Sequence, residues 1–403
     1  MKLCRLALRG LSRNRRRTIA TLLAIAVGFA SISLFAGYTR NVYRGLAHQA
    51  IHAGMLGHLS LWKRGSASEG KLDPGRFLFT GEEVGKISKI LNADPDVEFS
   101  APRLSLSGLI SNGRASTIFV ADGISPQAAE TLKGSVKLDD SRPDGILPGS
   151  GLADMLHLKN GSVVQLLTAT KNGQANALDA SVIGDFNTGN AGSNDKFVFM
   201  PLAFAQSLYD AEDSADRITV LLDDAGKSEI VRARLRKKLK AAGFDVEIRT
   251  WRELSDFYNQ VHRMFDTIFG FIFSIVLTVV VMSVANSMGM TVIERTREIG
   301  TLRSIGLKRL GVVRLFAMEA FLLSAVGVIA GFALALLVRQ GVNAAHLSYI
   351  PPGSSARVPL EVDLDPGKIA IAAIVMLAVG SAAALFPATR AAGKPIVEAL
   401  GHV

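Results

Sequence analysis

Four long apolar runs constrain the fold of this chain of 403 residues more than any other feature. They cover residues 18–39, 267–293, 315–338 and 368–389. A helix that crosses a membrane needs about 20 predominantly apolar residues, and each run is long enough. The runs therefore predict a membrane α-helical protein with four transmembrane helices. Hydrophobic residues make up 49% of the chain, which suits a membrane protein with a sizeable soluble part.

Basic residues cluster beside the apolar runs. Residues 1–17 hold seven Lys and Arg and no acid, and residues 294–314 hold six Lys and Arg against two Glu. Loops rich in Lys and Arg stay on the cytoplasmic side of a membrane. We therefore expect both termini and residues 294–314 in the cytoplasm. The net charge of +10 is then a signal of topology, and we expect no nucleic-acid partner.

Residues 40–266 separate the first two runs and are numerous enough to form a domain with its own core. Strand-like segments alternate there with turns, which predicts an α+β extracytoplasmic domain inserted between the first and second transmembrane helices. Residues 170–194 are rich in Gly, Asn, Ala and Asp and predict an exposed loop or a β-excursion. Residues 251–266 carry apolar side chains at helical spacing without Pro or Gly, and they predict a helical stalk that leads into the second span.

The remaining segments are short. Residues 1–17 place leucines on one face and arginines on another, which predicts an amphipathic helix along the inner leaflet, in contact with membrane lipids. Residues 294–314 have a helical pattern. We expect residues 339–367 to form a short outer loop and residues 390–403 a cytoplasmic tail.

Motifs of enzymes and metal sites are missing or incomplete. Gly65–Leu72 resembles a phosphate-binding P-loop, but Leu72 stands where Ser or Thr would bind magnesium. His48 and His52 are four residues apart without a third ligand at a suitable spacing. The single Cys4 excludes an internal disulfide. We therefore expect no catalytic residue and no metal site, and any ATP-driven role would need another subunit.

Two features lie inside the third apolar run. Gly327 and Gly331 are four residues apart, and small residues at this spacing let membrane helices approach closely. Glu319 is the one acid of the run, and acids within membranes are costly and usually paired. We expect Glu319 to pair with a basic residue near the interface, and Arg314 lies close in sequence. A helix-contact or proton role is the alternative.

The segment Glu294–Gly306, ERTREIGTLRSIG, resembles the block that follows the second span in the FtsX-like permease family of ABC transporters. The resemblance continues through Glu319 and Gly327. The C-terminal segment from Pro387 to Leu400 resembles the closing motif of that family, and the basic N-terminus resembles its first helix. The likeness of residues 40–266 is weaker, although coverage is nearly full length.

The resemblance implies half of a dimeric membrane core, formed with a second copy or a homologous permease, in the cytoplasmic (inner) membrane of a bacterium. ATP and magnesium would bind to a separate cytoplasmic ATPase, and this chain would hold no cofactor. A periplasmic carrier or adaptor could be a further partner. The residues implied in contact with the ATPase are Glu294, Arg297, Glu298, Gly300, Arg303 and Gly306.

Three functions remain open from the sequence. The first is mechanotransmission, in which ATP hydrolysis moves the inserted domain to release lipoproteins or to export a hydrophobic cargo. The second is signalling, in which that domain controls a periplasmic hydrolase. The third is passive anchoring of a partner, which needs no ATPase.

Overall fold

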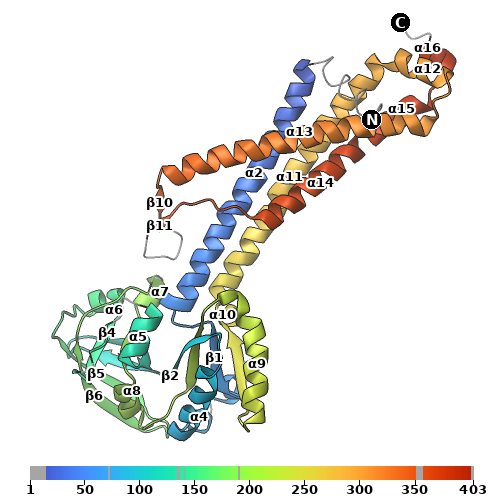
Figure 1. The fold of residues 1–403 in the computed structure, drawn as a ribbon. Coiled ribbons are helices and arrows are strands. Elements are labelled where there is room, and N and C mark those ends of the chain that lie inside the picture. The colour runs from blue at the N-terminus through green and yellow to red at the C-terminus, as the bar shows by residue number, and fades with distance from the viewer. Residues whose placement is uncertain are drawn as a thin grey trace. The chain divides into compact units, whose positions relative to one another are not determined.

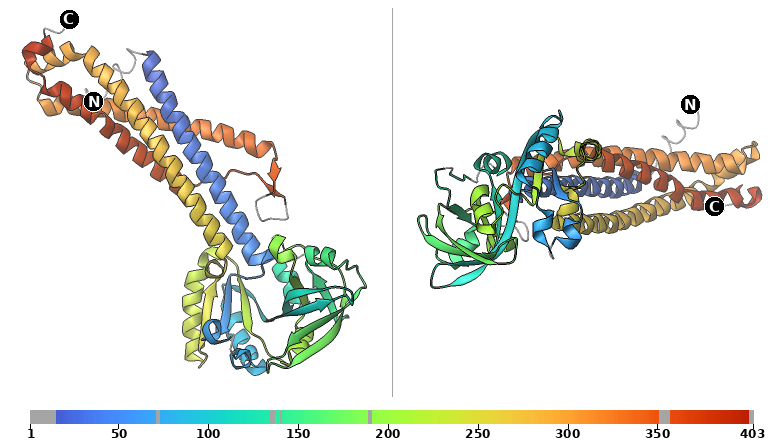
Figure 2. Two further views of the ribbon diagram at one scale, coloured as in Figure 1. Left: turned by 180° about the vertical axis from the view of Figure 1, so that it is seen from behind. Right: turned by 90° about the horizontal axis from the view of Figure 1, so that it is seen from below.

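The computed structural model describes residues 15–70, 73–133, 137–139, 141–188, 191–350 and 357–400 (Figures 1 and 2). Most of the predicted N-terminal amphipathic helix, residues 1–14, and the last three residues of the tail lie outside the described residues. The chain forms two compact units. Residues 45–260 with 349–358 form one, here called the inserted domain, and the rest form the helical unit.

Four helices of the structure are long and apolar enough to cross a membrane, which confirms the predicted fold class. They are α2 (Arg15–His48), α11 (Asp256–Glu294), α13 (Arg309–Ala344) and α14 (Pro366–Ala383), which α15 (Leu385–Gly393) continues after Ala384. Helices satisfy their own backbone hydrogen bonds, as a lipid environment demands. Each helix extends beyond the residues of its apolar run, because polar residues at the ends can remain helical in water.

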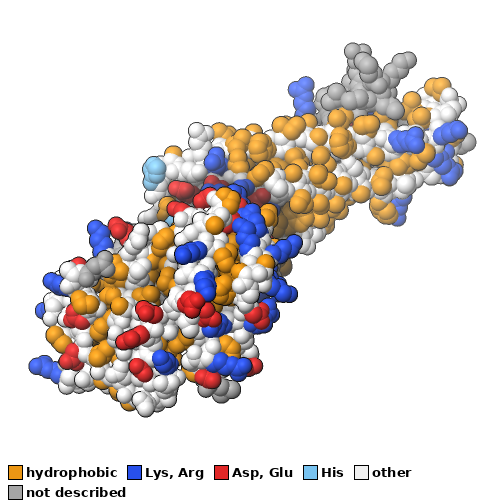
Figure 3. All heavy atoms as spheres, turned by 60° about the horizontal axis from the view of Figure 1, so that its bottom comes forward, with side chains coloured by type: hydrophobic (Ala, Val, Ile, Leu, Met, Phe, Trp, Pro, Cys, Tyr) orange, Lys and Arg blue, Asp and Glu red, His pale blue; other side chains and the backbone are white. Residues whose placement is uncertain are grey.

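The helical unit has a continuous apolar core. Ile25 and Phe29 of α2 pack with Val284 of α11, Leu323 of α13 and Met376 of α14. In both ribbon views α2 and α11 run alongside each other (Figures 1 and 2). On the face that Figure 3 shows, hydrophobic side chains cover much of the helical unit, whereas charged side chains are scattered over the inserted domain. Such an apolar exterior suits contact with lipid.

The inserted domain is built on nine strands, which confirms its predicted α+β class. The strands are β1 (Leu59–Lys63), β2 (Val97–Ser111), β3 (Ser116–Ile124), β4 (Gly145–Pro148), β5 (Val163–Ala169), β6 (Ala175–Val182), β7 (Phe197–Pro201), β8 (Arg217–Leu222) and β9 (Val246–Thr250). Their order is β3-β7-β4-β6-β5-β2-β8-β1-β9, and β3 also pairs with β2. The extra pairing closes six strands into a ring, here called the barrel half.

The remaining three strands and β2 form an antiparallel sheet in the order β2-β8-β1-β9, which α4 (Gly81–Asn92) and α9 (Ser228–Ala241) cover. This order and these crossovers are those of a ferredoxin-like β-α-β-β-α-β arrangement, so we name it the ferredoxin-like half. The capping box of Thr80 and Glu83 begins α4. The 15-residue strand β2 belongs to both halves, because its first part pairs with β8 and its second part with β3 and β5.

Short helices complete the inserted domain. They are η1 (Gln49–Ala53), α3 (Ser66–Glu69), η2 (Pro74–Phe77), α5 (Pro126–Lys133), α6 (Ser150–Met155), α7 (Ala191–Asn194), α8 (Leu202–Tyr209), η3 (Ala225–Lys227) and α10 (Trp251–Leu254). Within the predicted outer loop, α13 extends to Ala344, and β10 (Ser348–Tyr349) pairs with β11 (Val358–Pro359).

The predicted stalk over residues 251–266 is interrupted at Ser255. A capping box of Thr250 and Glu253 starts the one-turn helix α10, and Ser255 then leaves the helical region with φ −100° and ψ 85°. The Ser255 hydroxyl accepts a hydrogen bond from the Tyr258 N–H at 3.3 Å and so caps the next helix. From Asp256 to Glu294 helix α11 continues without a break.

Candidate functional site

The segment between α11 and α13 forms a separate short helix, α12 (Thr296–Ser304), with a break on each side. Arg295 lies outside helical geometry with φ −109° and ψ 15°. After α12 the chain turns at Gly306, whose φ of +103° favours glycine. The helical pattern predicted over residues 294–314 is therefore divided among the end of α11, the whole of α12 and the start of α13.

Helix α12 is fixed to the helices around it. Ile299 packs in a cluster with Phe316 of α13 and Ala388 and Ala391 of α15. Gly300 is buried on the same side. The Arg303 guanidinium donates a hydrogen bond to the Lys394 carbonyl, and α12 also contacts α16 (Ile396–Leu400). A displacement of α12 would therefore move several helix ends together.

A buried ion network joins α12 to α13. Arg295 donates from Nη1 to Glu319 Oε2 at 3.2 Å and from Nε to Glu298 Oε2 at 2.9 Å. The Glu319 side chain is 2% exposed and that of Arg295 is 15% exposed. The Arg295 guanidinium also lies 5.9 Å from the centre of the Phe316 ring. This side chain thus fills the break between α11 and α12 and holds α12 against α13.

Arg295 is a residue that the sequence reasoning missed. Glu319 pairs with a basic residue, but the partner is Arg295 and not the nearby Arg314. Five residues on a helix correspond to a rotation of about 140° from a shared face, so Arg314 and Glu319 point in different directions. The signal that could have found Arg295 is the helix break, which brings a residue 24 positions away to the acid.

The six residues implied in ATPase contact do not share one surface. Glu294 pairs with Arg17 at 3.1 Å, and Glu298 pairs with Arg295. Gly300 is buried and Arg303 is half-buried, whereas Arg297 and Gly306 are exposed. The exposed surface of α12 and of the turn after it also includes the apolar Leu302 and Ile305, which are 38% and 79% exposed.

The two glycines of the third run pack against α2. A Cβ on Gly327 would lie 2.7 Å from the Ile25 side chain, and a Cβ on Gly331 would lie 2.6 Å from the Ala26 carbonyl oxygen. Both distances are too short for a side chain. Small residues therefore allow α13 to approach α2 closely within the chain itself.

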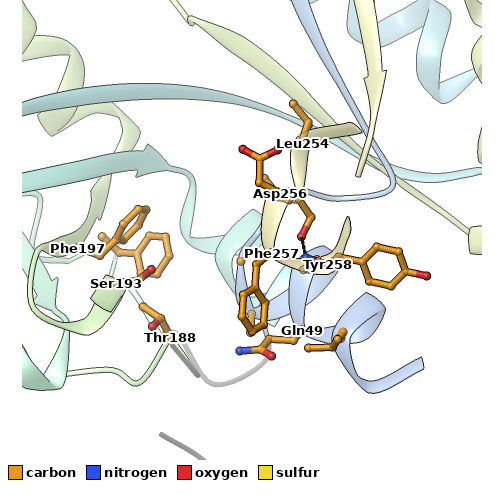
Figure 4. Close-up of a pocket in the computed structure, with 15 residues that line it drawn as sticks. Gln49, Thr188, Ser193, Phe197, Leu254, Asp256, Phe257 and Tyr258 are labelled. Atoms are coloured by element: carbon orange, nitrogen blue, oxygen red, sulfur yellow. Dashed lines mark hydrogen bonds between the residues drawn. The ribbon is translucent and has the colours of Figure 1, made fainter. Parts of the chain in front are cut away.

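The inserted domain holds a pocket of about 270 Å³ between η1, the α10–α11 junction and the barrel half. Figure 4 shows Gln49, Phe257 and Tyr258 on one side of it and Thr188, Ser193 and Phe197 on the other. The Phe197 ring continues into an aromatic cluster with Phe186 and Phe199. The pocket is small and mainly apolar, and it lies where the ends of two long helices enter the domain.

A second buried ion network lies at the junction of the two halves of the inserted domain. Asp122 of β3 accepts from Arg103 of β2 at 3.1 Å and from Arg217 of β8 at 2.6 Å. Arg103 also donates to the carbonyl oxygen of Met55, directly after η1. The side chains of Arg103 and Asp122 are 1% and 2% exposed. This network connects the chain after η1 to three strands.

Three histidines lie near η1. The rings of His48 and His52 are 4.5 Å apart, and those of His52 and His58 are 6.4 Å apart. Burial, with a smaller contribution from His52, lowers the pKa of His58 to about 4. Its Nδ1 accepts a hydrogen bond from the Leu222 N–H, as a neutral ring does. Among the described residues, no group of three His, Cys, Asp or Glu side chains is arranged to hold a metal ion.

Comparison with known proteins identifies two families along the chain. Residues 18–238 match the MacB-like periplasmic core domain, and residues 270–396 match the FtsX-like permease C-terminal domain. The two matches cover the inserted domain up to α9 and the last three long helices. Neither family is a nucleotide-binding domain.

Curated relatives are distant. The pyoverdine export ATP-binding/permease protein PvdT of Pseudomonas putida is 25% identical over 346 residues, which are 83% of this chain and 51% of that protein. The lipoprotein-releasing system transmembrane protein LolC of Neisseria meningitidis serogroup B is 23% identical, over 75% of this chain and 78% of that protein. The chain thus spans about half the length of the first relative.

Among solved structures, the periplasmic region of MacB from Actinobacillus actinomycetemcomitans is similar at 14% identity with a TM-score of 0.36. The similarity covers 49% of this chain and 89% of that structure. The family matches, together with four helices that can cross a membrane, show a multi-pass membrane protein with a periplasmic domain. The chain belongs to the FtsX-like ABC transporter permeases that carry a MacB-like periplasmic core domain.

Proposed function

We propose that this chain is the membrane subunit of a mechanotransmitting ABC transporter, in which a separate ATPase moves α12. The observation that carries this proposal is the construction of α12. It is a short helix whose inner face is fixed to the ends of α13 and α15, while its outer surface leaves Arg297, Leu302 and Ile305 exposed. An exposed apolar side chain with a charged neighbour suits a protein interface.

The basic charge around α12 favours a cytoplasmic location, where an ATPase would find ATP and magnesium. In this arrangement the ATPase binds the nucleotide, and α12 of this chain transmits the movement of the ATPase to the membrane helices. The stroke would pass from α12 to α11, whose helix runs unbroken from Glu294 to Asp256. The N-terminus of α11 and the region after α2 belong to the inserted domain, so the domain would respond.

The two relatives are named for pyoverdine export and for lipoprotein release, which are different cargoes. We propose export or release of a lipidated or hydrophobic cargo, with a second permease copy or a homologous permease and with a periplasmic carrier or adaptor as further partners. Membrane lipids would contact the apolar outer surface of the four long helices.

Crosslinking tests the ATPase contact directly. A photo-crosslinking amino acid at Ile305 should capture an ABC ATPase in cells, identified by mass spectrometry. The matched control is the same amino acid at Ile118, which is 59% exposed in the inserted domain and should capture no ATPase. If the amino acid at position 305 captures other proteins but no ABC ATPase, the proposal is contradicted.

Stimulation of ATPase activity gives the functional test. Once the captured ATPase is purified, Arg297→Glu and Ile305→Asp should lower its stimulation by the permease several-fold. The structure favours these variants over charge reversal at Glu298, since Glu298 pairs with Arg295 and its change would also disturb the chain's own network. Unchanged stimulation in both variants would count against α12 as the contact.

A further inference from the structure

A large cleft lies between the two halves of the inserted domain. Its volume is about 1160 Å³, which exceeds the ~300–1000 Å³ common for small-molecule sites. One wall comes from β1, β9 and the segment before α4, and the other from β2, β3, the β5–β6 hairpin and the end of α8. None of the residues assigned to the α12 site takes part in it.

Aromatic side chains from both halves line this cleft. Trp62 of β1 and Phe77 of η2 come from one half, and Tyr209 at the end of α8 comes from the other. The backbone at Tyr209 is fixed to the β5–β6 hairpin, since the Tyr209 carbonyl accepts a hydrogen bond from the Lys171 N–H at 3.0 Å. Flat aromatic faces suit the apolar face of a ring-shaped ligand, and Tyr and Trp add a hydrogen-bond donor.

Three acidic and two basic side chains line the cleft, so their net charge is small: Asp73, Asp216, Glu247, Lys171 and Arg249. Glu247 accepts from Arg249 of the same strand at 2.7 Å, and Asp216 pairs with Arg217 at 3.1 Å. Hydroxyl groups line the rest of the polar surface. They belong to Ser66, Ser105, Ser107, Thr168 and Thr170. A strongly charged ligand, such as a nucleotide, would find little net charge to bind.

Tyr209 and Asp216 supply a donor and an acceptor within this surface. Burial, and then the charge of Asp216, raise the pKa of Tyr209, so that the phenol keeps its proton and can donate. The Asp216 side chain is 26% exposed, and its Oδ2, which pairs with Arg217, has a further lone pair that can accept. A ligand that presents many hydroxyl groups, each able to donate and to accept, matches this combination.

We propose that the cleft binds a neutral saccharide, with Trp62 as the stacking platform and Tyr209 and Asp216 as hydrogen-bond partners. The size of the cleft admits more than one sugar ring. Binding would bridge the two halves of the inserted domain. The proposal does not depend on the ATPase contact of α12.

Tryptophan fluorescence provides the test, because the chain has two tryptophans and Trp251 is 3% exposed away from the cleft. The full chain with Trp251→Phe is placed in lipid nanodiscs, since common glycoside detergents would occupy a saccharide site. Titration with N,N′,N″-triacetylchitotriose and with maltotriose should change the Trp62 emission in a saturable manner. Tighter binding of triacetylchitotriose would indicate an N-acetylated glycan, and tighter binding of maltotriose a free neutral sugar.

Matched variants separate the cleft from other surfaces. Tyr209→Phe should weaken binding at least five-fold, whereas Tyr258→Phe, which removes a hydroxyl outside the cleft, should leave affinity unchanged. Calorimetry with Trp62→Ala should show no binding. If neither saccharide binds at 10 mM, on the order of the weakest specific affinities, the proposal is overturned. Binding that persists unchanged in Tyr209→Phe and Trp62→Ala would also overturn it.

Discussion

Two of the ion networks among the described residues, that of Asp122 and that of Arg295, have opposite charge patterns. In the inserted domain one carboxylate, Asp122, lies between the guanidinium groups of Arg103 and Arg217. In the helical unit one guanidinium, that of Arg295, lies between two carboxylates. A carboxyl group can take up a proton and become neutral, whereas a guanidinium group keeps its charge in proteins. The two networks therefore differ in what remains when the central residue is lost.

This difference suggests a division of roles. The network of the inserted domain is almost fully enclosed and connects three strands with the chain after η1, as a permanent joint would. The network of the helical unit lies at a helix break, and its Glu298 side chain is 43% exposed. Such a network could rearrange under the movement of α12 that we propose, because its components can change partners or charge. The proposed difference between the networks is tested by measuring how substitutions in each network change the stability of the protein.

The largest effect is expected for Asp122→Ala. The change leaves the buried Arg103 without a counter-ion and Arg217 with Asp216 alone, and breaking a buried pair in this way costs about 3–5 kcal/mol. Denaturant unfolding of the inserted domain in the full chain should show this loss. Asp179→Ala on the exposed face of β6 is the control and should stay within about 0.5 kcal/mol of the parent. A loss below 1 kcal/mol, about the value of an exposed pair, would refute the role of Asp122 as a joint.

A smaller effect is expected for Arg295→Met. The variant leaves Glu319 buried without its partner, and an unsatisfied buried group costs about 1–3 kcal/mol. Thermal unfolding of the chain in nanodiscs should register the loss. The double variant Arg295→Met, Glu319→Gln should recover part of it, because no charge then remains buried. If the double variant is less stable than the single one, the ion pair is not the source of the effect.

The long helices could be predicted from the sequence, because an apolar run determines its own structure in lipid without distant partners. The strand β2 could not. It contains Pro102 and Gly108, which weaken strand predictions, and its two parts contribute to different cores, so its side chains lack one simple alternation. For residues 170–194 composition predicted a loop or a β-excursion, and the structure has a β-excursion, since β6 pairs with β5 along seven residues.

In the candidate site, too, contacts between distant parts of the chain could not be predicted from the sequence. The residues of α12 were visible as a charged segment between two apolar runs. Which of them face inward depends on the breaks at Arg295 and Gly306, and these depend on packing against α13 and α15. The partner of Glu319 was therefore predicted only as a residue type. Contacts that cross a helix break are set by tertiary structure.

The pH dependence of the inserted domain should come from a histidine and not from its arginines. The pKa of His58 is lowered to about 4 in the fold from its usual 6.5. Below pH 6.5 the His58 ring is protonated in the unfolded chain but stays neutral in the folded chain. The free energy of unfolding therefore decreases as pH falls toward 4. Between pH 7 and pH 5 the loss should be roughly 2 kcal/mol.

Unfolding of the full chain at several pH values measures this slope. His58→Asn keeps an acceptor for the Leu222 N–H without a titrating ring, and it should flatten the slope. His157→Asn, at a position without this buried environment, is the control and should leave the slope as it is. An equal slope in the parent and in His58→Asn would show that another group is responsible.

The smallest effect concerns the backbone at the end of α12. Gly306 has a φ of +103°, which a residue with a Cβ adopts only with strain, although a Cβ there would meet no atom within 4 Å. Gly306→Ala should therefore cost about 1 kcal/mol through the backbone alone. Gly341 has equally open surroundings but lies inside α13, so Gly341→Ala should leave stability equal or raise it by up to about 1 kcal/mol. Thermal unfolding of both variants in nanodiscs tests whether the two changes in stability have opposite signs. If the two variants behave alike, the turn after α12 is not fixed by its backbone, and the ion network of Arg295 would be the main element that sets the position of this helix.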